Sequence, residues 1–160
     1  METKNSTGTM RLNRRSFLSL VGGAALALPL ATLLPKTAQA GSKEADEFLK
    51  SKVKGAMKDG RVTIIAPEIA ENGNTVPITI TVESPMTEKD YVKTVYLVAE
   101  GNPNPGVATF NLSPMMGEAK VDIRIRLAKT QKVIAVAEMS DGSAWKGSQE
   151  IKVTIGGCGG

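Results

Sequence analysis

Between residues 62 and 155, the chain contains several segments in which hydrophobic and polar residues alternate with a period of two. In one segment, for example, Ile78, Ile80 and Val82 alternate with threonines. Successive side chains of a strand point to opposite faces of a sheet, so this alternation predicts strands with one buried face. Seven strands are predicted, at residues 62–66, 76–83, 92–100, 107–112, 119–127, 132–139 and 145–155.

The predicted strands follow one another without an intervening helix. Turn-forming residues separate them, and Asp141-Gly142 between the last two is typical of a type I′ hairpin turn. This pattern predicts an all-β fold, an immunoglobulin-like antiparallel β-sandwich, with a small barrel as the alternative. Pro77 and Pro85 predict that their strand lies at a sheet edge, because proline cannot donate a backbone hydrogen bond.

A helical period precedes the strands. Between residues 43 and 58, hydrophobic residues recur at spacings of three and four, and lysines occupy the other side. This spacing predicts a short amphipathic helix that needs a surface to pack on. We therefore expect residues 41–155 to form one domain, a short N-terminal helix followed by the sandwich.

The first 40 residues have the composition of a targeting segment. A basic opening is followed by an apolar run from Phe17 to Leu34 and by Ala38-Gln39-Ala40, a small-x-small cleavage sequence. Arg14-Arg15, within Asn13–Leu18, matches the twin-arginine export signal. A membrane anchor is the alternative, although glycines and a proline interrupt the apolar run. Residues 1–40 are therefore predicted to be a cleaved export signal, which places the protein in the periplasm without a membrane attachment.

Removal of this segment changes the charge of the protein. The whole chain has 20 Lys and Arg against 16 Asp and Glu, and residues 1–40 hold five of the basic and one of the acidic residues. The remaining chain therefore has 15 of each and no net charge. A neutral domain gives no reason to expect binding to nucleic acid or to an anionic membrane.

The residue types present exclude most catalytic chemistry. The chain has no His and a single Cys, so it lacks the ligands of a zinc or haem site, and a serine or cysteine nucleophile has no imidazole base. We expect no catalytic residue, no metal and no cofactor. Among the remaining candidates, Arg124 and Arg126 alternate with hydrophobic residues and are expected to face water. Met115-Met116 and Trp145 are expected to be packed or to lie at an interface.

The C-terminus, Gly156-Gly157-Cys158-Gly159-Gly160, is the most informative segment. Cys158 follows the last predicted strand with two glycines on each side, which remove neighbouring side chains and permit every backbone conformation. We therefore expect residues 156–160 to form a flexible arm that carries an exposed thiol into the sites of other proteins. No cation lies nearer in sequence than Lys152, so nothing in the chain activates the thiol, as suits a carrier better than an enzyme.

Two other functions would also use an unpaired cysteine. In a structural or adhesion module, Cys158 would form an intermolecular disulfide. In a thiol redox enzyme it would need a resolving cysteine, which the chain lacks. The covalent carrier is the interpretation that we prefer, with the disulfide-linked module as the alternative.

The chain resembles the SoxY family, the sulfur-carrier subunits of the Sox thiosulfate-oxidising system. The resemblance rests on the terminal Gly-Gly-Cys-Gly-Gly motif behind a twin-arginine signal. It continues through Ile69–Gly73, Val76-Pro77, Ser84–Met86, Arg124–Ala128 and Glu138–Gly142, and so covers nearly all of the predicted mature chain.

This resemblance implies an immunoglobulin-like sandwich and a heterodimer with a SoxZ-like subunit, which lacks its own export signal. It implies that a c-type cytochrome complex (SoxAX-like) joins thiosulfate to Cys158. A SoxB-like hydrolase then releases sulfate and leaves a persulfide, on which a sulfane dehydrogenase acts. The sequence leaves open the fate of the sulfane sulfur, the partner-binding face, the role of disulfide-linked dimers and whether cleavage follows Ala40 or a neighbouring residue.

Overall fold

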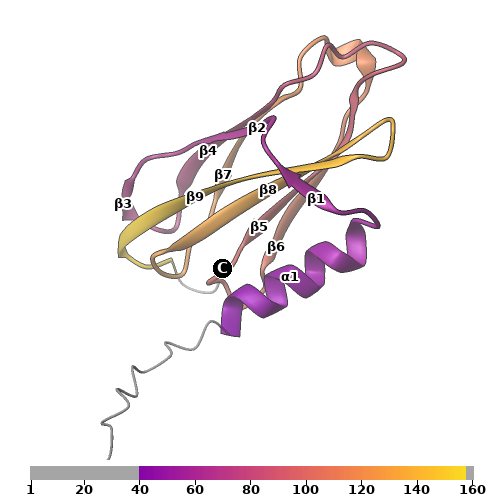
Figure 1. The fold of residues 1–160 in the computed structure, drawn as a ribbon. Coiled ribbons are helices and arrows are strands. Elements are labelled where there is room, and N and C mark those ends of the chain that lie inside the picture. Colours follow the sequence, from indigo (N-terminus) through magenta and orange to yellow (C-terminus); the bar gives the residue numbers. More distant parts are fainter. Residues whose placement is uncertain (1–39, 158–160) are drawn as a thin grey trace, which may run out of the picture. The chain divides into compact units, whose positions relative to one another are not determined.

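The computed structural model of the protein describes residues 40–157 (Figure 1). The predicted export signal up to residue 39 lies outside the described residues, as do Cys158, Gly159 and Gly160. Within the described part the chain forms one helix, α1 (Ala40–Lys52), nine strands and a short 3₁₀ helix at Pro114–Met116.

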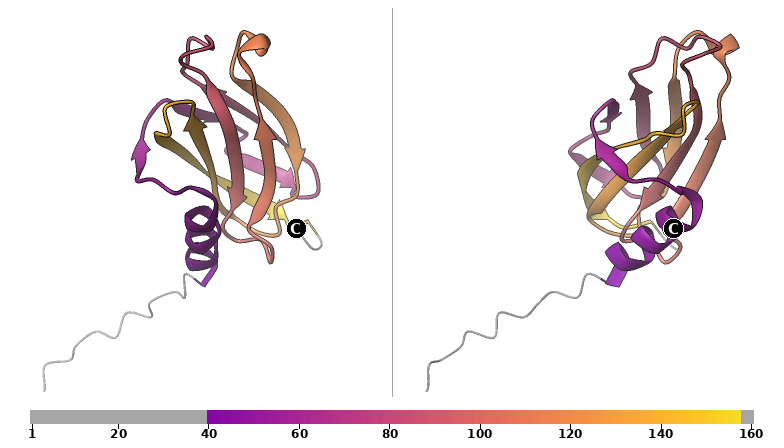
Figure 2. Two further views of the ribbon diagram at one scale, coloured as in Figure 1. Left: turned by 90° about the vertical axis from the view of Figure 1, so that its right-hand side faces the viewer. Right: turned by 45° about the vertical axis from the view of Figure 1, so that its right-hand side comes forward.

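The strands form two sheets that pack face to face as a sandwich (Figures 1 and 2). The larger sheet has the order β1 (Met57–Asp59), β9 (Ala144–Ile155), β8 (Gln131–Met139), β5 (Val92–Ala99) and β6 (Gly106–Asn111), and β3 (Ile69–Asn72) also pairs with β9. The smaller sheet has the order β2 (Val62–Ile65), β4 (Val76–Val82) and β7 (Lys120–Ile125). All seven predicted strands are present, with ends that differ by at most two residues, so the predicted β-sandwich is confirmed.

The main hydrophobic core lies between the two sheets. In β4, alternate residues are buried and partly exposed, as the period of two predicts. The side chains of Ile78 and Ile80 from β4, Leu97 from β5 and Ile151 from β9 are almost completely buried in this core. Burial of each such side chain contributes roughly 1.5–3 kcal/mol, which makes this layer the main source of stability.

The larger sheet also buries part of its outer face, because α1 packs there (Figure 2). Ala45 and Leu49 of α1 contact a second cluster that includes Tyr96 and Val98 of β5. This second contact explains why β5 and β8 are buried almost without interruption, although strands of a one-sided sheet alternate. Within residues 40–157, no helix is long and apolar enough to span a membrane.

The predicted helix at residues 43–58 is too long at its C-terminal end. In the structure α1 ends at Lys52, and residues 57–59 form β1, which pairs in parallel with the start of β9. Gly55, between the two elements, has a low helix propensity. Met57 packs against the same cluster as α1, so its spacing from Val53 resembled the continuation of a helical face.

The edge position predicted for the proline-containing strand is wrong, because β4 is the central strand of the smaller sheet. The sheet tolerates Pro77 because β2 pairs only with residues 79–82 of β4, so Pro77 has a neighbouring strand on one side alone. Pro85 lies beyond the end of β4. The proline rule therefore applies to this position of the strand, rather than to the strand as a whole.

The hairpin predicted at Asp141-Gly142 is confirmed, but its turn type is wrong. A type I′ turn needs positive φ at both central residues, and here only Gly142 has positive φ, at 82°. The Gly142 N–H donates to the Met139 carbonyl at 3.1 Å, and the Ser143 N–H donates to the Asp141 carboxylate at 2.8 Å. Hydrogen bonds from the side chain and backbone of Ser143 hold the pKa of Asp141 below its usual value.

Candidate functional site: the C-terminal segment

The candidate site begins where β9 ends. Cys158, the predicted attachment residue, lies outside the described residues together with Gly159 and Gly160. Gly156 and Gly157, the first two residues of the predicted arm, are described, and they show how the chain approaches the cysteine. Gly156 is exposed, whereas Gly157 is buried.

Backbone hydrogen bonds hold this segment to two other parts of the chain. The Gly73 N–H, just after β3, donates to the Ile155 carbonyl at 2.8 Å. The Leu127 N–H, in the connection between β7 and β8, donates to the Gly73 carbonyl at 2.7 Å. The Gly157 N–H in turn donates to the Leu127 carbonyl at 2.9 Å. Three chain segments that are far apart in sequence thus form one continuous set of backbone contacts.

Glycine is required at these contacts because the backbones approach so closely. A Cβ atom on Gly157 would lie 2.8 Å from the Gly73 carbonyl oxygen, and one on Gly156 would collide with the Ala128 carbonyl oxygen. A Cβ atom on Gly73 would collide with the Leu127 carbonyl oxygen and lie 2.7 Å from the Gly157 nitrogen. None of these three glycines has positive φ, so they serve close approach and not a special backbone conformation.

The flexible arm predicted at residues 156–160 therefore starts with two residues that pack against the sandwich. The flexibility expected of Cys158, Gly159 and Gly160 stays a prediction. Sequence reasoning gave the glycines two purposes, conformational freedom and the removal of side chains beside the thiol. It missed the close approach of backbones at Gly156 and Gly157, which depends on the fold and has no signature in the local sequence.

A buried polar network fixes the connection between β7 and β8. The Asn102 side-chain amide donates to the Arg126 carbonyl at 2.9 Å, and its oxygen accepts from the Ala128 N–H at 3.0 Å. The Gln131 amide donates to the same Asn102 oxygen at 2.8 Å. Because Asn102 binds the residues on both sides of Leu127, it sets the position of the carbonyl that receives the Gly157 N–H. Sequence analysis missed Asn102 and Gln131, since a polar residue beside a turn is usually exposed.

Other side chains singled out in the sequence lie away from these contacts. Arg124 and Arg126 are exposed, as expected. Met115 is 96 % exposed, so it is not packed within the described chain, and an interface role stays a prediction. Trp145 is partly buried against the main core, with the Arg61 guanidinium 4.9 Å from its ring centre.

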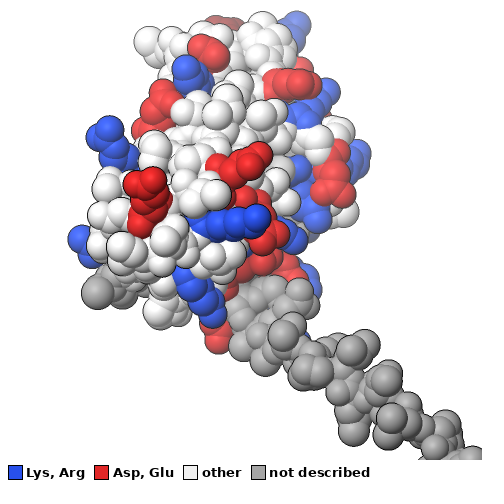
Figure 3. Space-filling model, turned by 90° about the vertical axis from the view of Figure 1, so that its left-hand side faces the viewer, with Lys and Arg blue, Asp and Glu red and all other residues white. Residues whose placement is uncertain are grey.

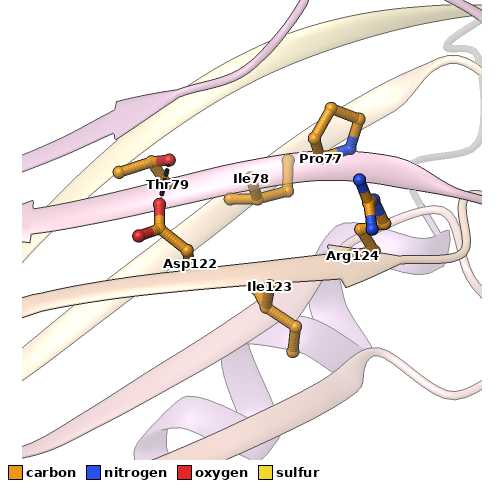
Figure 4. A pocket seen from close by; sticks show the side chains of 6 residues that line it. All are labelled: Pro77, Ile78, Thr79, Asp122, Ile123 and Arg124. Carbon is orange, nitrogen blue, oxygen red and sulfur yellow. Dashed lines mark hydrogen bonds between the residues drawn. The ribbon is translucent and has the colours of Figure 1, made fainter.

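A hollow of about 330 Å³ lies between β4 and β7 (Figure 4). It is lined by Pro77, Ile78, Thr79, Asp122, Ile123 and Arg124. The Asp122 carboxylate accepts a hydrogen bond from the Thr79 hydroxyl at 2.5 Å, as Figure 4 shows. None of the lining residues belongs to the segments that contact Gly156 and Gly157, so we do not include this hollow in the candidate site.

On the face shown in Figure 3, acidic and basic side chains intermingle, and no large patch of one sign forms. Burial, followed by the charge of Glu138, raises the pKa of Tyr96, whose hydroxyl lies 3.4 Å from that carboxylate. Tyr96 belongs to the cluster beneath α1, so this shift concerns packing of the helix rather than the C-terminal segment. Within residues 40–157, no three His, Cys, Asp or Glu side chains are grouped as metal ligands.

Comparisons with known proteins identify the family and the fold to which the chain is similar. The family model described as sulfur oxidation protein SoxY matches residues 46–158, a span that ends at the cysteine. The fold is similar to the solved structure of the sulfur carrier protein SoxY from Chlorobium limicola f thiosulfatophilum. The TM-score is 0.61 and the sequence identity 29%, over 71% of this chain and 94% of that chain. Searches among curated proteins find no significant match.

A second group of solved structures shares the fold alone. The superoxide reductase (neelaredoxin) from Ignicoccus hospitalis has a TM-score of 0.51 and 23% identity, over 59% of this chain and 80% of that chain. Three of the segments on which the sequence resemblance rests, residues 69–73, 124–128 and 156–160, include the residues that meet at the end of β9. The family model covers residues 46–158, most of the chain, and the chain belongs to the SoxY family of sulfur oxidation proteins.

Proposed function

We propose that this protein is a sulfur-substrate carrier, which holds thiosulfate-derived intermediates covalently on Cys158 and presents them to the enzymes of the Sox pathway. The observation that carries the proposal is the family match, which extends through Cys158, the only cysteine of the chain. The related protein from Chlorobium is itself described as a sulfur carrier.

The proposed chemistry has two main steps. In the first, the Cys158 thiol and thiosulfate form an S–S bond and give cysteine S-thiosulfonate, with release of one proton and two electrons. A c-type cytochrome complex of the SoxAX kind accepts these electrons. In the second step, a SoxB-like hydrolase adds water to the terminal sulfur, which leaves as sulfate with one proton, and a persulfide remains on Cys158. A sulfane dehydrogenase is the proposed next partner.

The carrier itself catalyses neither step. Its chain has no His to act as a base near neutral pH, and the proposed partners supply the oxidant and the hydrolytic site. We propose no cofactor for it beyond the sulfur adducts on Cys158. Many enzymes must reach this thiol, and the glycines on each side of Cys158 carry no side chains that would block their approach.

The proposal includes a place and a partner. Residues 1–40 direct export to the periplasm by the twin-arginine route, which transports folded proteins, and a SoxZ-like subunit is carried along in a heterodimer. No nucleic acid and no membrane takes part after cleavage. The lack of net charge on residues 41–160 supports the proposal that neither nucleic acid nor an anionic membrane is bound.

The proposal is tested by the intact mass of the protein, purified from the periplasm of cells grown on thiosulfate. We expect mass increases that correspond to added sulfur atoms or to a thiosulfonate group. They should disappear after reduction and be absent from the Cys158→Ser variant.

Two other results would contradict the proposal. An unmodified thiol in thiosulfate-grown cells would remove the carrier function. A dimer that is sensitive to reductant and carries no small adduct would favour the structural or adhesion module linked through Cys158.

A further inference from the structure

We infer that Gly73, Gly156 and Gly157 form a backbone clasp that fixes the point where the Cys158-bearing terminus leaves the fold. The carrier arm then begins at Cys158 rather than at Gly156. This inference rests on the proposed carrier function for its purpose, but the clasp itself is defined by described residues alone.

The first argument is the closed set of hydrogen bonds. Three backbone hydrogen bonds of 2.7–2.9 Å join, one after another, Ile155 to Gly73, Gly73 to Leu127 and Leu127 to Gly157. The Val153 N–H, three residues before Gly156, also donates to the Thr130 hydroxyl at 2.9 Å. The connection between β7 and β8 therefore holds the chain both within β9 and beyond its end. A segment intended only as a flexible tether would need none of these bonds.

The second argument is steric. The atoms that a Cβ on Gly156 or Gly157 would meet belong to the backbone, which cannot swing aside as a flexible side chain does. By contrast, a Cβ on Gly55 would meet its nearest atom, the Gly142 carbonyl oxygen, at an ordinary 3.7 Å. Glycine is thus needed at the clasp for a reason that does not apply at Gly55.

The third argument is that the receiving side of the clasp is rigid. Leu127 is completely buried, and the Asn102 amide is bonded to the backbone of both neighbouring residues. Loss of these hydrogen bonds would leave a buried amide unpaired, which costs free energy. The Leu127 and Ala128 carbonyls therefore have little freedom to move away. The clasp therefore closes against a fixed surface.

The clasp changes the reach of the thiol. From Ile155, three extended residues would carry Cys158 roughly 10 Å from the fold, whereas one residue beyond Gly157 spans only about 3.5 Å. The sulfur is then presented close to Gly73 and to the connection between β7 and β8. An enzyme that acts on the sulfur must also accommodate these two segments, so Gly73, Gly156 and Gly157 act as positioning residues.

The mobility of a nitroxide spin label on Cys158 tests the inference directly. The label can be attached to this residue alone, because it is the only cysteine of the chain. The mature protein is compared with Gly156→Ala, Gly157→Ala and the matched control Gly55→Ala. Thermal unfolding is measured for each labelled variant.

We expect the two clasp variants to give sharper electron paramagnetic resonance spectra, with a rotational correlation time shortened about twofold or more, because the tether lengthens. The wild type and Gly55→Ala should give the same slower motion. Identical spectra for all folded variants would overturn the inference. A purely structural role would lower the unfolding temperature without changing the motion of the label, and would likewise overturn it.

Amide hydrogen exchange in the wild-type protein provides a second measurement that needs no variant. We expect the Gly157 amide to exchange about tenfold or more slowly than an unstructured peptide, because opening of the clasp costs free energy. Exchange at the unprotected rate would overturn the inference, even if the alanine variants fail to fold.

Adduct formation separates the inference from the proposed function. With Gly157→Ala, we expect the fraction of Cys158 that carries sulfur adducts in cells to fall several-fold below that of Gly55→Ala. Its reaction with a small aromatic disulfide reagent should not slow. Absence of adducts from the wild type would contradict the carrier function and leave the spin-label result unchanged. Equal adduct levels in both variants would overturn the positioning role alone.

Discussion

Asn102 shows how one buried side chain organises the backbone around the candidate site. It lies in the connection between β5 and β6, yet its side-chain amide forms hydrogen bonds with the backbone of Arg126 and Ala128 in the connection between β7 and β8. It also accepts a hydrogen bond from the Gln131 side chain. With only 5 % of its surface exposed, it has almost no access to water that could replace these partners. The position of the β7–β8 connection thus depends on an amide that belongs to another hairpin.

Replacement of Asn102 by alanine should therefore destabilise the whole domain. The change leaves the Arg126 carbonyl, the Ala128 N–H and part of the Gln131 amide without partners, and each such buried group costs about 1–3 kcal/mol. We expect a loss of about 2–4 kcal/mol in the free energy of unfolding, allowing for some relaxation. Urea denaturation of the mature protein measures this loss.

Asn104→Ala is the matched control, because Asn104 lies in the same turn and is exposed. Its effect should stay within about 0.5 kcal/mol. Equal effects of the two substitutions would show that the Asn102 network does not hold the connection.

At the scale of the elements, β9 is the strand that joins the parts of the fold. It is 12 residues long, and it pairs with β8 along most of its length, with β1 at its start and with β3 at its end. Near its start Gly147 lies directly against β2, because a Cβ there would collide with the Val62 carbonyl oxygen. The backbones of β2 and β9 are therefore in close contact at a position where β9 has no side chain.

We expect Gly147→Ala to destabilise the sandwich by about 1–3 kcal/mol, because the inserted methyl group forces two backbones apart. Since φ at Gly147 is not positive, strain in the residue itself does not contribute. Thermal or urea unfolding measures the effect. The adjacent, exposed Ser148→Ala should change stability by no more than about 0.5 kcal/mol. A Gly147→Ala protein as stable as the wild type would contradict the close approach of β2 and β9.

Seven of the nine strands could be predicted, because their sequences contain either an alternation of apolar and polar residues or a continuous apolar run. The strands β1 and β3 could not be predicted in this way. They have three and four residues, and only Ala70 among them is buried, so no alternation is visible. Both pair in parallel with a strand that is distant in sequence, and such pairing leaves no local turn signal.

The candidate site likewise has a part that local sequence indicates and a part that depends on the fold. Cys158 was chosen from the sequence because it is an isolated cysteine between glycines, and its role stays a prediction. The contacts of Gly156 and Gly157 could not be predicted, because they depend on where the β3–β4 turn and the β7–β8 connection lie in space. The resemblance to SoxY pointed to segments that include Gly73 and Leu127, but it did not show that they meet.

At the scale of the whole molecule, the position of α1 bears on the proposed export and cleavage. The helix begins at Ala40, the residue before the predicted cleavage site, and its buried residues Ala45, Leu49 and Val53 all follow that site. Cleavage after Ala40 would therefore leave every described contact between α1 and the sheet intact. The signal can be removed without loss of the surface that covers β5 and β8.

We expect the double substitution Arg14→Lys and Arg15→Lys to stop export, because the twin-arginine pair is the feature by which this route recognises its cargo. The protein should then accumulate in the cytoplasm with the mass of the full 160-residue chain. The control Lys4→Arg retains a basic residue outside the pair and should be exported and cleaved as the wild type is. Intact mass and N-terminal sequence of the cytoplasmic and periplasmic fractions measure both outcomes.

If the double variant still reached the periplasm and were cleaved, another route would export the protein. Such a route would transport each subunit as a separate unfolded chain with its own signal. The proposed assembly with a SoxZ-like subunit before transport would then no longer be required.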